Sequence, residues 1–133
     1  LLTKEKLEVV KVDLGNDEFV YVTQMTGRQR DNFEQSLLKK IRDNKGVVTS
    51  YEQVTDDFRA KLAVVTVCDE TGALLFEPKD YNLLSMSIGI VKLEKIVNAA
   101  QKLNAITEED KESLVKNSEP EAADSSSSVS VEN

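Results

Sequence analysis

A β-hairpin pattern that runs directly into a helix start constrains the fold of this chain more than any other feature. Residues 7–14 and 19–23 are rich in β-branched and aromatic residues and flank the turn Gly15-Asn16-Asp17-Glu18, which is typical of a hairpin. Apolar and charged residues alternate in the first strand, so one face of the hairpin should be buried. Because a lone hairpin is marginally stable in water, the helices that follow must cover that face.

The helix start lies at Thr26, where the sequence predicts a capping box. The Thr26 hydroxyl can accept a backbone N–H, and Gln29 can reach back to the Thr26 N–H. We expect a first helix from Thr26 to Asp43, ended by Asn44-Lys45-Gly46. Its apolar residues recur on one side of a helix: they are Phe33, Leu37, Leu38 and Ile41. Residues 47–54 have no strong pattern and are expected to be a connection.

A second helix is expected from Thr55, because a hydroxyl cap followed by Asp56 and Asp57 is a typical helix N-terminus. The run from Leu62 to Cys68 fits a buried strand equally well on propensity alone. We favour helix, because Phe58, Leu62 and Val65 agree with the cap.

The rest of the chain shows a turn, a short extended piece and three more helices. The turn is at residues 69–72, and residues 73–76 are extended. Helices are expected from Pro78 to about Ser85, from about Ile88 to Leu103, and from a cap at Thr107. The longest of them places one face in the core, consisting of Leu93, Ile96, Val97, Ala100 and Leu103.

The predicted fold class is α+β and mainly α-helical, with an N-terminal β-hairpin at 7–23 followed by about four to five helices. Residues 1–116 form a single folded domain, of which 26–115 is mostly helical. From Asn117 the composition changes to Ser, Glu, Ala and Asp. Such a segment holds too little apolar surface to offset its ordering entropy, so 117–133 is predicted to be a disordered acidic tail.

Charge and hydropathy argue against two classes of partner. The 24 acidic residues outnumber the 17 basic ones, and the net charge of -7 opposes binding to nucleic acid or anionic lipid. No apolar run approaches the roughly 20 residues that cross a bilayer, and the first residues lack the apolar centre of a signal peptide. We expect a cytoplasmic protein.

The composition also argues against an enzyme. The chain has no histidine and one cysteine, so it holds no catalytic triad with His, imidazole metal site or internal disulfide. Cys68 precedes Asp69 and Glu70, whose charges disfavour a thiolate, so we expect an inert core thiol. The acidic clusters lack the spacing of a calcium loop. We expect no catalytic residue, metal or cofactor, although a mechanism based on Lys or carboxylates stays formally open.

The helix start carries two arginines that have no evident structural partner in the sequence. Arg28 and Arg30 lie in a tract that lacks a glycine-rich phosphate loop, and Asp31 and Glu34 dilute its charge. A solvated helix face or a contact with another protein is therefore favoured over anion binding. If this segment has a functional part, Arg28 and Arg30 are the predicted protein-contact residues.

Taken in order, several motifs resemble those of the tail assembly chaperones of long-tailed phages. After the hairpin come Met25-Thr26-Gly27-Arg28, Arg59-Ala60-Lys61-Leu62, Val67-Cys68-Asp69-Glu70, Asn98-Ala99-Ala100 and Thr107-Glu108-Glu109-Asp110. The resemblance covers about residues 7–116. It implies a small, mostly helical protein of the infected or lysogenic host cytoplasm. Such a protein binds the tape measure protein, helps to recruit the tail tube protein and leaves before the virion is finished.

The resemblance implies no catalytic residues. We also expect self-association, because a long client invites many copies. The alternative is a structural phage tail component, either a tail tube or a tail completion subunit. Such subunits are usually richer in strands, whereas here strands are expected only at 7–23 and 73–76.

Overall fold

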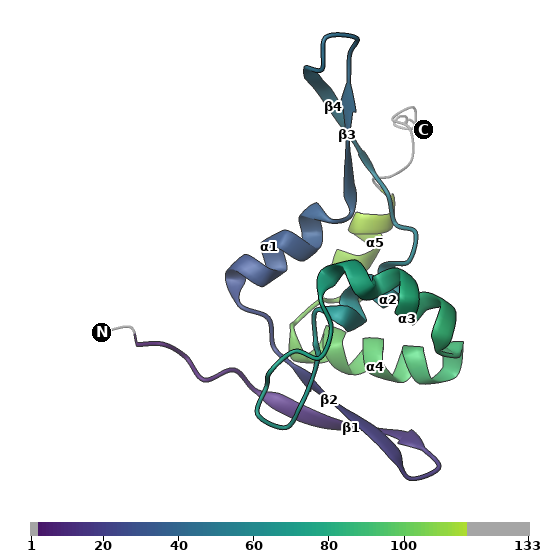
Figure 1. The fold of residues 1–133 in the computed structure, drawn as a ribbon. Helices are drawn as coiled ribbons and strands as arrows, with labels where there is room; N and C mark the ends of the chain where they lie inside the picture. Colours follow the sequence, from purple (N-terminus) through teal and green to yellow (C-terminus); the bar gives the residue numbers. More distant parts are fainter. Residues whose placement is uncertain (1–2, 117–133) are drawn as a thin grey trace, which may run out of the picture.

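The computed structural model describes residues 3–116 (Figure 1), and the predicted tail at 117–133 lies outside the described residues. Within the described part, an N-terminal strand hairpin is followed by five α-helices, which confirms the α+β class.

The N-terminal sheet contains the predicted hairpin and one further strand. Strands β1 (Val9–Gly15) and β2 (Glu18–Thr23) pair antiparallel. Asn16 and Asp17 connect them with positive φ angles of 54° and 65°, the conformation that a two-residue hairpin turn requires. Strand β5 (Val67–Cys68) pairs antiparallel with β2, so the strand order is β1-β2-β5.

Helix α1 (Gly27–Gln35) begins with the predicted capping box. The Gln29 N–H donates to Thr26 Oγ1 over 3.1 Å, and the Thr26 N–H donates to Gln29 Oε1 over 2.8 Å. The helix ends at Gln35, with Ser36 as its C-cap. The prediction that it runs to Asp43 is therefore wrong.

The residues that follow form a second hairpin instead. Strands β3 (Leu38–Arg42) and β4 (Val48–Gln53) pair antiparallel, so residues 47–54 are not an irregular connection. Asp43 shapes the turn, because its Oδ1 accepts the N–H of Lys45 over 2.8 Å and of Val47 over 3.0 Å. We call residues 38–53 the arm, which projects away from the rest of the protein (Figure 1).

The segment after the arm contains both a helix and a strand. Helix α2 (Phe58–Val64) has Asp57 as its N-cap, and no side chain caps it, so the predicted Thr55 cap is wrong. Three residues after Val64 the chain enters β5. The helix assignment for residues 62–68 therefore holds only as far as Val64, and the strand alternative holds for Val67 and Cys68.

The C-terminal half follows the prediction closely. It contains η1 (Pro78–Asp80), α3 (Tyr81–Ser87), α4 (Ile90–Leu103) and α5 (Glu108–Lys116). Thr107 and Asp110 form a reciprocal cap at α5, with bonds of 3.0 and 3.1 Å. Of the extended piece expected at 73–76, only Leu74 pairs, in an isolated bridge with Cys68, and the chain bends at residues 75 and 76. None of the described helices is long and apolar enough to cross a membrane.

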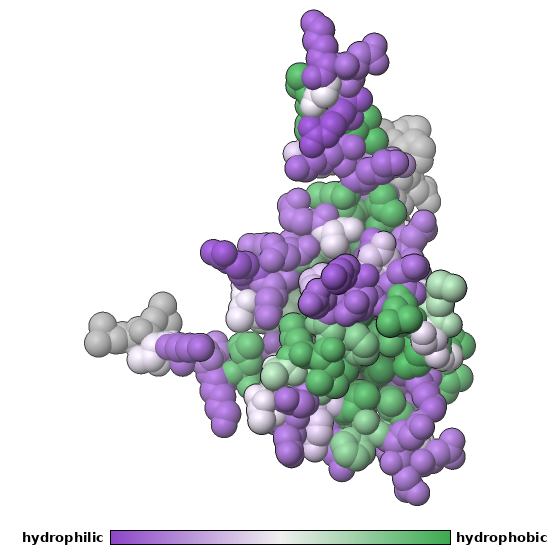
Figure 2. All heavy atoms as spheres, viewed as in Figure 1, coloured by the Kyte–Doolittle hydropathy of each residue, from purple (hydrophilic) through white to green (hydrophobic). Residues whose placement is uncertain are grey.

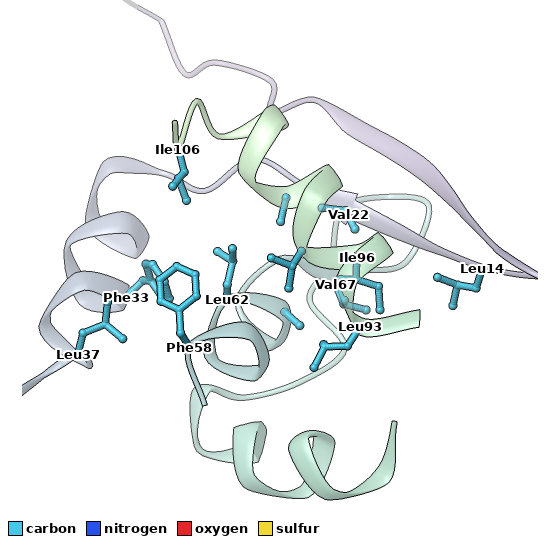
Figure 3. Close-up of a cluster of buried hydrophobic side chains, with 13 residues drawn as sticks. Leu14, Val22, Phe33, Leu37, Phe58, Leu62, Val67, Leu93, Ile96 and Ile106 are labelled. Atoms are coloured by element: carbon cyan, nitrogen blue, oxygen red, sulfur yellow. The ribbon is translucent and has the colours of Figure 1, made fainter. Parts of the chain in front are cut away.

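The core lies between the hairpin, α2 and α4 (Figure 3). From α4 it takes Leu93, Ile96, Val97 and Ala100, as predicted. At one end Phe33 and Phe58 face each other, with ring centroids 5.7 Å apart in an edge-to-face arrangement. Leu37 is fully buried, whereas Leu38 and Ile41 of the expected helical stripe lie on the arm.

Asn104 fastens three elements together at the end of α4. Its Oδ1 accepts the Met25 N–H over 2.6 Å, and its Nδ2 donates to Ala100 O over 2.9 Å and to Thr23 O over 3.4 Å. Its own carbonyl accepts from Arg30 Nη1 over 3.1 Å. One residue thus connects the end of β2, the start of α1 and the end of α4.

We predict that Asn104→Ala lowers the free energy of unfolding by about 1–3 kcal/mol, because it leaves the partly buried Met25 N–H without its acceptor. Urea unfolding followed by circular dichroism measures the effect. Asn98→Ala is the matched control, since Asn98 is an exposed asparagine of α4, the helix that Asn104 caps, and its effect should stay within about 0.5 kcal/mol. Equal effects of the two variants would contradict the role of Asn104.

Candidate protein-docking surface

An exposed apolar cluster lies where α3 meets α4. Four large apolar side chains are more than half exposed within nine residues: Leu83 (64%), Met86 (82%), Ile90 (57%) and Val91 (66%). We call these four residues the corner. Figure 2 shows hydrophobic residues gathered on the half of the protein that holds α3 and α4. Contiguous exposed apolar surface of this kind marks interaction sites in soluble proteins.

The local sequence explains why these side chains stay outside. Helix α3 packs against α2, and its inward side uses Leu84, followed by Ile88 just beyond the helix end. Helix α4 buries the face that contains Leu93, Ile96 and Val97; Val91 points away from this face, and Ile90 is the first residue of the helix, one turn before the first buried position. A helix of seven residues buries only one side, and the residues on its other side remain exposed.

A groove of about 300 Å³ lies between α1, α2 and the η1–α3 segment. Its apolar lining comes from Phe33, Val65, Pro78 and Tyr81, and two lysines, Lys61 and Lys79, line it as well. The Lys61 ammonium lies 5.1 Å from the centre of the Tyr81 ring and donates to Ser36 O over 3.2 Å. The groove therefore combines an apolar wall with the positive charge of Lys61, whereas the Lys79 ammonium is paired with Glu77 over 3.5 Å.

The groove and the corner each include a residue of α3, but on different sides of that helix. Tyr81 lines the groove at the start of α3, and Leu83 of the corner follows two residues later, a spacing that does not share a helix face. The corner by itself is suited to apolar side chains spaced along one face of a partner helix. A carboxylate of a partner in the groove would be attracted to Lys61.

The structure separates the two arginines predicted as contact residues. Arg30 is partly buried and holds Glu34 in an ion pair of 3.0 Å, besides its bond to Asn104 O. The expectation that Arg30 has no structural partner is therefore wrong. Arg28 is exposed and lies one helical turn before Asn32, which lines the groove. Residues four apart share a helix face, and Arg28 stays a predicted contact residue.

Cys68 and Asp69, two other residues with reactive side chains, are held by burial and by hydrogen bonds. Cys68 is 1% exposed, and burial, with a smaller contribution from the Asp69 charge, raises its pKa, so the reactive thiolate is disfavoured. The Asp69 carboxylate has a lowered pKa because it accepts bonds from the Thr71 hydroxyl and from the backbone of Ala73 and Thr71. In the part of the chain that the structure describes, no three His, Cys, Asp or Glu side chains gather as metal ligands.

Sequence reasoning missed the corner, although a signal was present. The face of α4 was predicted from Leu93 onward, and Val91 lies off that face while still apolar, as does Leu83 beside the inward-facing Leu84 of α3. Apolar residues in excess of what a helix face can bury indicate an exposed patch. The arm was missed for a different reason, because the apolar spacing in residues 33–41 fits a helix.

Comparison of the chain with protein-family models, with curated proteins and with solved structures found no match. The resemblance to phage tail assembly chaperones rests on the order of its sequence motifs and stays a prediction.

The two arginines give a matched pair of variants. We predict that Arg30→Ala lowers the free energy of unfolding by about 1–2 kcal/mol, because a partly buried charged hydrogen bond to Asn104 O is lost. The exposed Arg28 should tolerate Ala within about 0.5 kcal/mol. Chemical denaturation of the two variants tests this, and a stable Arg30→Ala protein would count against the structural role.

Proposed function

We propose that this chain is a phage or prophage tail assembly chaperone, a non-enzymatic protein of the host cell cytoplasm. It binds the tape measure protein, keeps it soluble and assists tail tube assembly. The observation that carries the proposal is the corner, since four large apolar side chains of α3 and α4 are more than half exposed and lie outside the core cluster of the described residues. The ordered motifs that resemble this family support the same function.

The chemistry of the surface suits such a client. A tape measure protein is a long helical polypeptide with apolar faces, and an amphipathic helix docks by placing side chains at i, i+3, i+4 and i+7 into an apolar groove. In the proposed complex, the client helix lies along the exposed side of α3, with its apolar side chains on the corner. The groove, on another side of α3, is a second contact, where carboxylates of the client lie near Lys61.

Weak binding at each site suits a chaperone that must dissociate from its client before the virion is finished. Burying one such apolar side chain contributes roughly 1–2 kcal/mol, so a single small corner binds weakly. Many copies along one client hold it through avidity, and each copy still dissociates readily. Weak individual contacts thus combine protection of the client with release during assembly.

Co-expression with the tape measure protein from the same genome tests the proposal. We expect higher tape measure solubility and a complex that co-purifies; unchanged solubility and no complex would overturn it. The double variant Leu83→Ser with Met86→Ser should weaken binding by about tenfold or more, because it removes apolar contact area. Val47→Ser is the matched control, since Val47 is as exposed as Ile90, at 57%, but lies in the turn of the arm. Its binding should equal that of the wild type.

A structural tail component is the second candidate, and the second hairpin favours it. Strands were expected only at residues 7–23 and 73–76, which is few for such a subunit, but β3 and β4 add a second hairpin. Mass spectrometry of purified particles separates the two functions. A chaperone should be missing from the finished virion, whereas a tube or completion subunit must be present in many copies.

A further inference from the structure

The arm is a two-stranded sheet with little support from the body. Its strands pair with each other, and neither packs broadly against another described element. None of the apolar residues of the arm belongs to the core cluster or packs against it. Because an isolated two-stranded hairpin is marginally stable in water, the arm is the part of the structure that gains most from a partner.

The two edges of the arm differ in chemistry. Strand β3 carries Lys39, Lys40 and Arg42, whereas β4 reads Val-Thr-Ser-Tyr-Glu-Gln and has Glu52 as its single charged residue. Proteins protect an edge strand from further pairing with lysines and other charges. By this criterion β3 is the protected edge, and β4 is rich in β-branched and aromatic residues and open to another strand.

We infer that β4 pairs antiparallel with β4 of a second copy of this chain, which gives a four-stranded sheet in the order β3-β4-β4-β3. The same edge on both copies is self-complementary, as a two-fold axis requires. The inference stands whether or not the chain is a tail assembly chaperone, since it rests on the arm alone.

The charges of the arm favour a second copy on β4. Pairing through β4 leaves the cations of each β3 on opposite outer edges, three strand spacings or about 14 Å apart, beyond the screening length of about 8 Å in physiological salt. With the axis at Ser50 or Tyr51, Glu52 lies opposite Val48 or Ser50 of the second copy, so no two carboxylates face each other. Tyr51, which is 59% exposed in one copy, gains cross-strand contacts.

Pairing through β3 has the opposite consequence. It would place two rows of cations side by side, which is unfavourable because like charges directly opposite each other destabilise a strand pair. An interface of two six-residue strands is small, so the dimer is weak and its fraction rises with protein concentration.

Single-cysteine substitutions in the full chain test this geometry. Ser50→Cys and Tyr51→Cys lie on β4 close to the proposed axis, and Lys39→Cys and Lys40→Cys are matched controls on β3. Native Cys68 is buried and should not react. Under mild oxidation with glutathione disulfide, we expect at least one β4 variant to form a disulfide-linked dimer on the order of tenfold faster than either β3 variant. The reason is that a disulfide requires Cα atoms within about 7 Å.

Light scattering on the wild-type protein gives an independent measure. The weight-average mass should rise above the 14.8 kDa of one chain as the concentration increases, and Ser50→Lys should reduce that rise because it places lysines near each other across the axis. Circular dichroism identical to that of the wild type checks that each variant is folded.

A wild-type mass of one chain at every concentration would overturn the inference. So would equal cross-linking of the β3 and β4 variants, or no cross-linking of any variant, which is the result expected if β4 takes a strand of another protein.

Discussion

Burial of one central segment, residues 58–68, holds the body of this protein together. Helix α2 buries Phe58, Ala60, Leu62, Ala63 and Val64. Helix α4 packs on one side of it, Phe33 of α1 contacts Phe58, and β5 extends the segment into the N-terminal sheet. Each of these surrounding elements has one apolar face and cannot bury it alone. Residues 58–68 are apolar enough for all of these elements to bury their faces against them, so the N-terminal hairpin and the helices depend on the same core.

The limited surface of residues 58–68 also determines which apolar side chains stay exposed to solvent. Segment 58–68 offers a limited surface, which the hairpin, α1, α3 and α4 share. Helix α3 is only seven residues long and contacts α2 with one side, so Leu83 and Met86 remain exposed. The arm leaves the body directly after α1 and Leu37, and its apolar side chains lie outside the core cluster. The corner and the arm, which are the two proposed interaction surfaces, are thus parts of the chain whose apolar side chains do not pack into the core.

Correct and incorrect sequence predictions differ in the range of the interactions involved. The Thr26–Gln29 capping box, the turn at Asn16 and Asp17 and the buried face of α4 depend on residues that are close in sequence, and the structure confirms them. Residues 36–43 were predicted as helix because the spacing of Phe33, Leu37 and Ile41 fits a period of 3.6. In the structure Leu38 pairs with Gln53, and the Val54 N–H donates to Leu37 O over 2.6 Å. The spacing within residues 33–41 carries no information about that partner.

The sequence by itself determined the caps, the first hairpin, the inner face of α4 and the lack of histidine chemistry, because each follows from residue types or from atoms within a few residues of one another. Only the tertiary structure decided that Arg30 bonds to Asn104, 74 residues away, and that Asn104 accepts the Met25 N–H. It also decided that Leu83, Met86, Ile90 and Val91 remain exposed. Local hydrogen bonds form wherever the right residues are spaced correctly. Burial and long-range pairing depend on which distant segments compete for the same core.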